Sequence, residues 1–202
     1  MKKLFLGAAI AMSSLTFAQT FGVKAGMNVS SISKDADLSD QGSKIGFNAG
    51  VTMNVPLAAS FSIQPELLYS QYGDKYNMDI LGTTYARSRH LDYITLPVMF
   101  QYNATPAFYL EAGPEFGLLV SAKDRFTDES NNDLIDESGN YKDSLNGLNV
   151  GIGIGAGYYF TPKVGVTARY VAGLTDINNS DNNGDRNSVK NNVFQVGLAY
   201  KF

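Results

Sequence analysis

Residues 151–160 read GIGIGAGYYF, and three interpretations of this stretch predict three different kinds of protein. Gly151, Gly153 and Ala156 match the G-x-G-x-x-G/A pattern of dinucleotide-binding turns, and Asp176 follows Ala156 by 20 residues. Glycines four residues apart also match the G-x-x-x-G pattern of paired membrane helices. The third interpretation is a β-strand with one face made of glycine. The rest of the chain decides between an enzyme, a helical membrane protein and a β-barrel.

The sequence around this stretch alternates with a period of two, as in a β-strand that has one apolar face. The alternation is regular in five segments: 21–29, 45–55, 148–160, 164–174 and 194–202. Three less regular segments each contain an interior proline: about 61–72 with Pro65, 91–102 with Pro97 and 108–120 with Pro114. Because proline cannot donate to a ladder, we expect β-bulges at these prolines.

The eight segments predict an all-β fold, an eight-stranded antiparallel up-and-down transmembrane β-barrel. Strands of about 11 residues suit a tilted crossing of the hydrocarbon core, which takes roughly 9–11. Short and long connections alternate along the chain, as in outer-membrane barrels with short periplasmic turns and long extracellular loops. The long loops are expected at 33–43, 73–89, 121–146 and 175–190.

A soluble antiparallel barrel such as a lipocalin is the alternative for the same strands. Its outer surface would be the polar face, which here is rich in glycine and poor in charge. Aromatic residues also gather at strand ends beside the short turns, as in an interfacial girdle. The predicted girdle is Phe61, Tyr102, Phe108, Tyr158, Phe160, Tyr200 and Phe202. Both features favour a barrel whose outer surface contacts outer-membrane lipid.

A strand is then the best interpretation of the opening stretch. A dinucleotide turn requires a helix after its glycines, whereas the alternation continues through Phe160. Residues 148–160 are also too few for a membrane helix, which needs roughly 20. The four glycines form a bare inward stripe, and we expect Arg169 and Glu115 to lean into the room beside it.

Residues 1–18 have the features of a secretory signal peptide, which leaves 19–202 as the outer-membrane barrel domain. Lys2 and Lys3 precede a short apolar run, and Ala18 provides a small residue for cleavage. Loss of the two lysines changes the net charge from −3 to −5, which argues against a nucleic-acid partner. The chain has no cysteine, so it has neither a disulfide framework nor a thiol nucleophile.

Three strand motifs resemble the PorT-like family of small outer-membrane β-barrels. They are QPELLYS at 64–70, LDYITLPV at 91–98 and AGPEFG at 112–117. The aromatic end Tyr200-Lys201-Phe202 is similar to the terminal signal that the barrel-insertion machinery reads, which makes Phe202 its expected contact. The resemblance implies the barrel architecture, with roles that extend to secretion accessories, and it accounts for the interior prolines.

Six ionisable residues are expected on the inward face of the barrel: Lys24, Glu66, Glu111, Glu115, Arg169 and Lys201. The interior of an eight-stranded barrel is just wide enough for side chains to fill, and buried charges must pair. We therefore interpret these three acids and three bases as a structural network that closes the lumen. A narrow ion or solute path is the alternative.

Two further patterns are weak candidates for chemistry. His90, the only histidine, is expected at the rim, where a base could serve a nucleophile, but the spacing singles out no nucleophile. The stretch 181–185 has the oxygen-rich side chains and central glycine of a calcium loop, without the full spacing or the final glutamate. We therefore predict no catalytic residue, no metal and no cofactor.

The expected function is that of a non-enzymatic outer-membrane protein of the Gram-negative envelope, with a structural or surface-interaction role through its extracellular loops. A secretion accessory or narrow pore is the second class, and a rim-site enzyme is the third. The loops would carry the function, and they contain no motif of high specificity.

Overall fold

The computed structural model describes residues 19–32, 41–80, 83–128, 133–137, 145–176 and 190–202. The strands in these ranges are β1 (Thr20–Ile32), β2 (Gln41–Ala58), β3 (Phe61–Ile80), β4 (Thr83–Asn103), β5 (Phe108–Asp128), β6 (Asp133–Glu137), β7 (Leu148–Tyr159), β8 (Val164–Gly173) and β9 (Asn191–Lys201). Within the same ranges, no helix is long and apolar enough to cross a membrane. The predicted signal peptide, residues 1–18, lies outside them.

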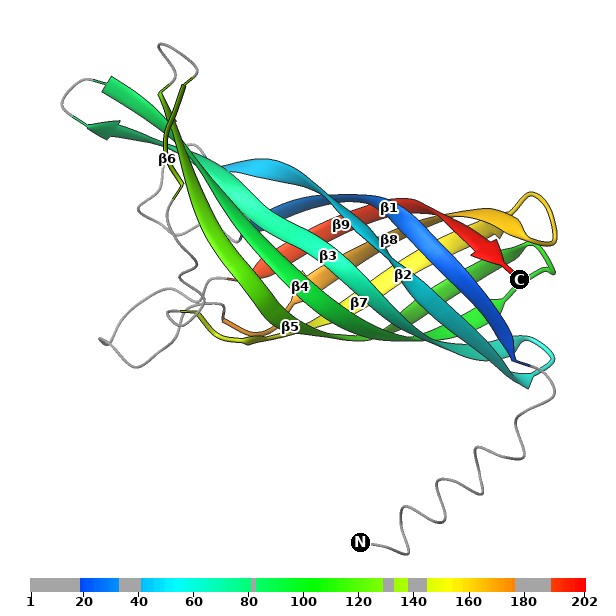
Figure 1. Ribbon diagram of the computed structural model, residues 1–202. Helices are drawn as coiled ribbons and strands as arrows, with labels where there is room; N and C mark the ends of the chain where they lie inside the picture. The colour runs from blue at the N-terminus through cyan, green and yellow to red at the C-terminus, as the bar shows by residue number, and fades with distance from the viewer. Residues whose placement is uncertain (1–18, 33–40, 81–82, 129–132, 138–144, 177–189) are drawn as a thin grey trace, which may run out of the picture.

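Eight of the described strands close into an antiparallel barrel, which confirms the predicted fold (Figure 1). Each strand from β1 to β5 pairs with its neighbour in sequence, and β5, β7, β8 and β9 continue the wall. The ladder between β1 and β9, from Gly22↔Lys201 to Ile32↔Asn191, joins the two ends of the chain and closes the wall. The short strand β6 pairs only with the outer end of β5 and is not part of the wall.

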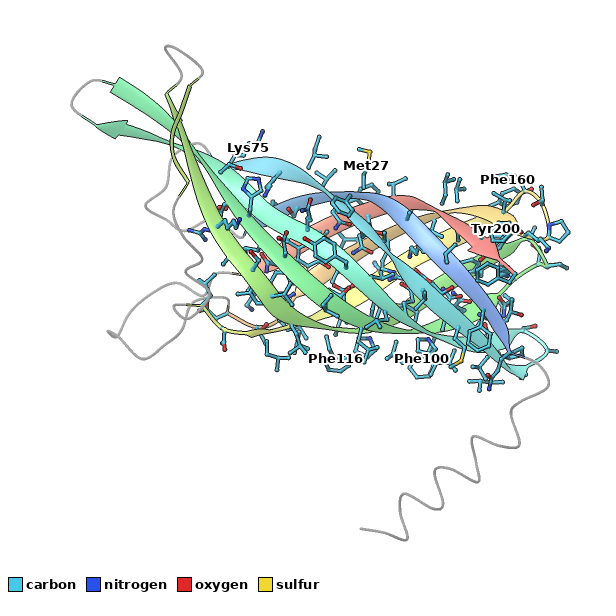
Figure 2. The ribbon with its side chains drawn as sticks, in the orientation of Figure 1. Met27, Lys75, Phe100, Phe116, Phe160 and Tyr200 are labelled. Carbon is cyan, nitrogen blue, oxygen red and sulfur yellow. The ribbon has the colours of Figure 1, made fainter. Side chains whose placement is uncertain are left out.

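Apolar side chains cover the outside of the barrel and polar side chains fill the inside. On β8, Val166 and Tyr170 are exposed, whereas Thr167 and Arg169 are buried. Figure 2 shows the same outward projection for Met27, Phe100 and Phe116. A soluble barrel has the opposite arrangement, because its outer face must be solvated by water. The outer face of this barrel suits lipid.

Four strands are longer than the sequence pattern predicts, because β2 to β5 have 18 to 21 residues each. The loop predicted at 73–89 is wrong, since β3 and β4 stay paired from Gly73↔His90 to Ile80↔Thr83. The loop predicted at 121–146 is wrong in part, because β5 continues to Asp128 and pairs there with β6. An apolar face is needed only where strands contact lipid, so these outer parts lack the period-two signal.

The outer parts of β3, β4 and β5, together with β6, form an extension that we call the blade. It comprises residues 74–80, 83–89, 122–128 and 133–137. Figure 1 shows the blade projecting beyond the rest of the barrel, at the end away from the C-terminus. The short turns and the C-terminus lie at the opposite, periplasmic end.

The bulges predicted at Pro65, Pro97 and Pro114 are wrong. One register holds on both sides of the prolines, as shown by Pro65↔Val98 with Leu68↔Thr95 and by Pro97↔Glu115 with Phe100↔Ala112. Instead, the ladders skip the positions around them: 53–54 opposite 64–65, 66–67 opposite 96–97, and 98–99 opposite 113–114. We call these three gaps the proline seam. The register shifts lie elsewhere, at Ser43/Asn48, Pro56/Ala58, Asp92/Tyr93 and Phe126/Thr127.

Candidate functional site in the barrel lumen

Arg169 of β8 is the centre of a buried ion-pair network in the lumen. Its Nη1 and Nη2 donate to Oε2 and Oε1 of Glu66, on β3, at 2.9 and 2.7 Å. Its Nε donates to Oε1 of Glu111, on β5, at 2.7 Å. All three side chains are fully buried. A bidentate guanidinium–carboxylate pair fixes both distance and orientation, so Arg169 holds three strands in a defined arrangement.

The remaining carboxylate positions are also occupied by donors. Gln64 Nε2 donates to Oε1 of Glu66 at 2.9 Å, and Lys24 Nζ lies 3.6 Å from Oε2. Gln101 Nε2 donates to Oε2 of Glu111 at 3.1 Å. Every oxygen of both carboxylates therefore has a partner, which is the condition under which buried charges are tolerated.

The four charges of this network come from every second strand around the wall. In order around the barrel, β1 contributes Lys24, β3 Glu66, β5 Glu111 and β8 Arg169. Counting strands around the closed wall places β3 and β8 diametrically opposite each other. The Arg169–Glu66 pair therefore spans the full width of the lumen.

The other two predicted members lie apart from this network. Glu115 Oε1 accepts a hydrogen bond from Tyr72 Oη at 2.6 Å, and Gln195 Nε2 lies 3.5 Å from the same hydroxyl. Glu115 Oε2 is buried and has no hydrogen-bond partner in the described part of the chain. Lys201 Nζ lies 3.7 Å from the centroid of the Tyr159 ring, near the periplasmic end. The expected six-residue network is thus one group of four with two separate residues.

The glycine stripe of β7 makes the room that this network occupies. A Cβ at Gly153 would lie 3.3 Å from Arg169 Cδ, and one at Gly155 would lie 3.1 Å from Glu111 Oε1. The prediction that Arg169 fills this space is confirmed. Glu115 is buried beside the stripe, as the register partner of Gly151, but its carboxylate turns toward Tyr72, and Glu111 is the carboxylate that lies close to Gly155.

Sequence reasoning missed an apolar layer that closes the lumen toward the extracellular end. We call it the apolar seal, and it consists of Tyr72, Leu91, Tyr93, Leu119, Ala122, Val171 and Val193. Each of these residues is at most 3% exposed. A signal was present, because the inward positions change from polar to apolar near the outer ends of β4, β8 and β9. Val171 and Val193 are examples.

The predicted girdle residues lie at the periplasmic ends of the wall strands. Phe61 packs against Tyr102 with ring centroids 5.3 Å apart, and Tyr200 packs against Phe202 at 5.7 Å. Tyr158 and Phe160 are exposed at the end of β7, and Phe108 is half-buried. The exposed rings give this end of the barrel an aromatic outer surface.

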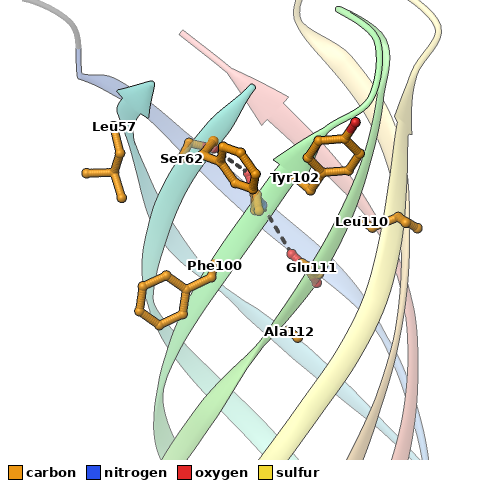
Figure 3. A pocket seen from close by; sticks show the side chains of 9 residues that line it. Leu57, Ser62, Phe100, Tyr102, Leu110, Glu111 and Ala112 are labelled. Atoms are coloured by element: carbon orange, nitrogen blue, oxygen red, sulfur yellow. Dashed lines mark hydrogen bonds between the residues drawn. The ribbon is translucent and has the colours of Figure 1, made fainter. Parts of the chain in front are cut away.

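A groove of about 430 Å³ lies on the outer wall beside the Phe61–Tyr102 pair. Figure 3 shows Leu57, Phe100 and Leu110 projecting around it, with the small side chain of Ala112 between strands. Ser62 and Glu111 also line the groove, although both residues are buried. The shape and apolar lining suit a lipid acyl chain.

The weak candidates for chemistry gain no support. His90 lies on β4, and its Nδ1 is 3.3 Å from the backbone oxygen of Ser88. Across the described ranges, no group of three or more His, Cys, Asp or Glu side chains could hold a metal ion. The calcium candidate at 181–185 lies outside the described residues.

Comparison with known proteins agrees with this architecture. The family described as outer membrane protein beta-barrel domain matches residues 17–179. The chain belongs to this family. It is therefore an outer-membrane β-barrel protein, and the match supports this broad family without reaching the PorT-like group. A search of curated proteins finds no match.

Solved structures show the same fold at low sequence identity. Ail, the attachment invasion locus protein of Yersinia pestis, in complex with the heparin analogue sucrose octasulfate, is 13% identical, with 92% of this chain and 100% of Ail covered and a TM-score of 0.50. Outer membrane protein W of E. coli is 16% identical, with coverage of 92% and 98% and a TM-score of 0.44. Neisserial surface protein A is 13% identical, with coverage of 90% and 97% and a TM-score of 0.46.

Proposed function

We propose that this protein is a non-enzymatic, non-conducting outer-membrane barrel that anchors a surface-exposed interaction blade. The observation that carries the proposal is the filling of the lumen by two successive layers, the four-residue charge network and the apolar seal. Outer-membrane lipid is the proposed partner of the apolar outer face. Exposed Phe202, at the end of β9, is the proposed contact of the insertion machinery.

The layers of the lumen oppose the transport alternative. An ion path requires continuous water, whereas the seal residues are almost fully buried and leave little room for it. The charged layer offers few free sites, because the carboxylate oxygens of Glu66 and Glu111 already have donors. The secretion-accessory role that the PorT-like resemblance implies remains compatible with a closed lumen, because such a role uses surfaces.

The blade is the surface best placed for contact outside the cell. β4 has 21 residues and β9 has 11, so the additional residues extend β4 by about 33 Å at about 3.3 Å each. A bilayer crossing does not require this length. Extended and paired strands hold their shape without lipid, so the blade can present a defined surface to a partner.

Charge indicates the chemistry of that partner. Residues 124–143, which include the outer end of β5 and β6, contain seven acidic and two basic residues. The Ail structure holds a sulfated heparin analogue, which is an anion. An acidic segment repels such a ligand, so we propose that a basic partner surface contacts the β5–β6 side of the blade. The β3–β4 side carries Asp74 and Asp79 against Lys75, Arg87 and Arg89, and it supports the β5–β6 side through the β4–β5 ladder.

Two measurements test the proposal. In planar bilayers the purified protein should give no steady conductance, and reproducible channels would replace this function with transport.

For the blade, Tyr76 and Arg87 are register partners, so an Asn-Gly turn can replace residues 77–86. Surface cross-linking on intact cells should capture a partner with the full chain and lose it with the shortened blade. Retention of the same cross-links by the shortened protein would contradict the proposal.

A further inference from the structure

A pocket of about 400 Å³ lies at the periplasmic mouth of the barrel, at the other end from the blade. The turn between β4 and β5, the turn between β7 and β8, and the end of β9 surround it. Its lining includes Pro106, Tyr159, Phe160, Thr161, Pro162 and Lys201. The volume is within the range of about 300–1,000 Å³ that is usual for small-molecule sites.

The two turns are built alike and form preformed walls. Thr105 Oγ1 accepts a hydrogen bond from the amide of Phe108, and Thr161 Oγ1 accepts one from the amide of Val164, both at 2.9 Å. A proline follows each threonine, and proline fixes the backbone of the turn. The Tyr159 amide also donates to Ala107 O at 2.7 Å, which ties one turn to β7. A ligand therefore meets walls that need little ordering.

Lys201 supplies the one charged group of the pocket. Its half-buried ammonium lies over the Tyr159 ring, 3.7 Å from the centroid. Among the described residues it has no ion pair: Glu66 and Glu111 pair with Arg169, and Glu115 accepts from Tyr72. An ammonium has three donors and the ring face accepts from one side only, which leaves donors for an acceptor in the pocket.

We propose that this pocket binds the free carboxylate of a periplasmic peptide whose last side chain is apolar. The carboxylate contacts Lys201 Nζ, and the side chain packs against Pro106, Phe160 and Pro162. A single ammonium between apolar walls matches a monoanion, whereas phosphate sites usually combine an arginine fork or several backbone donors. This site lies away from the blade, so it does not depend on the proposed function.

The decisive comparison uses the unmodified full-length protein in nanodiscs. The probe is the tripeptide Ala-Ala-Phe with a free carboxyl end, and the control is the same peptide amidated at that end. Titration followed by amide NMR shifts of Ala107 and Thr161 should show binding of the acid and binding at least about tenfold weaker for the amide. This ratio is the range of one charge-assisted hydrogen bond.

Variants locate the charge that is responsible. Lys201→Gln should weaken binding of the acid to the level of the amide. Lys163→Gln is the matched control. Lys163 belongs to the turn between β7 and β8 that lines the pocket, but its ammonium lies 5.8 Å from the centroid of the Tyr200 ring, on the outer side of the wall. It should leave binding unchanged. A second arm with a soluble cell-wall stem peptide asks whether the carboxylate comes from protein or from cell wall.

Three results would overturn the site. One is equal binding of the acid and the amide by the unmodified protein, a comparison that does not depend on how a variant folds. Another is an equal loss of binding in Lys201→Gln and Lys163→Gln, which would indicate a general charge effect. The third is the absence of shifts at millimolar concentration with both the tripeptide and the stem peptide.

Discussion

Arg169 and Glu66 are joined by two parallel hydrogen bonds of 2.9 and 2.7 Å across the lumen, although 103 residues separate them in sequence. Because β8 and β3 lie opposite each other in the wall, this pair ties the two halves of the barrel together. Glu111 and Lys24 complete the layer from the two intervening directions. The layer therefore fills the lumen and also links opposite sides of the wall; we call this second role the crossbrace.

Replacement of Arg169 by Met should therefore destabilise the barrel strongly. The change leaves Glu66 and Glu111 buried beside only Lys24, and loss of one partner of a buried ion pair costs about 3–5 kcal/mol. Urea unfolding in lipid vesicles measures the effect. The quadruple variant Arg169→Met, Glu66→Gln, Glu111→Gln, Lys24→Met is the control, and it should recover much of the loss because no uncompensated charge remains in the layer. A cost below about 1 kcal/mol for Arg169→Met would contradict the crossbrace.

Replacement of Tyr72 by Phe should also be costly, because it removes the hydroxyl that donates to Glu115 at 2.6 Å. Glu115 Oε2 already lacks a hydrogen-bond partner in the described residues, so the variant leaves the whole carboxylate without one. We expect a loss of about 1–3 kcal/mol in the same unfolding measurement. Tyr93→Phe is the matched control in the same apolar seal. Its hydroxyl accepts only a long 3.4 Å bond from Asn191, so the loss should be smaller. The reverse order of the two variants would show that Glu115 does not depend on Tyr72.

The membrane part of the fold could be predicted from sequence because lipid imposes a strict rule on every strand that it contacts. Val166, Ala168 and Tyr170 alternate with Thr167 and Arg169 for this reason, and the inward position of Arg169 follows directly. The blade is not subject to the rule, so its strands carry no period-two signal and the sequence predicts loops there. The sequence pattern also cannot predict which side chain each lumen carboxylate binds. Glu111 and Glu115 lie on the same face of β5, and they differ only in the residues of other strands that reach them.

The glycine stripe provides a matched pair of substitutions. A Cβ at Gly155 would lie 2.5 Å from the backbone oxygen of Ala168, and the paired strand cannot move away alone. A Cβ at Gly153 would lie 2.8 Å from Met99 Cε, the flexible end of a side chain. Gly155→Ala should therefore cost about 1–3 kcal/mol, the usual range for overpacking, and Gly153→Ala should cost clearly less. Unfolding midpoints of the two variants measure this, and equal costs would contradict a role for backbone contact.

The proline seam should be the least protected part of the membrane wall. The ladder between β3 and β4 skips residues 66–67, and Pro97 opposite them has no amide to donate. The lack of one net hydrogen bond, about 1 kcal/mol, should lower the exchange protection of the Glu66 amide, the remaining donor opposite Pro97, by about five- to tenfold. Hydrogen exchange by NMR in nanodiscs measures it, with Ala168 in the unbroken ladder between β7 and β8 as reference. Pro97→Ala restores a donor opposite Glu66 and should raise the protection of the Glu66 amide toward that of Ala168. Equal protection of the Glu66 and Ala168 amides in the unmodified protein would mean that the register alone, without the skipped pairs, is enough to hold the wall closed.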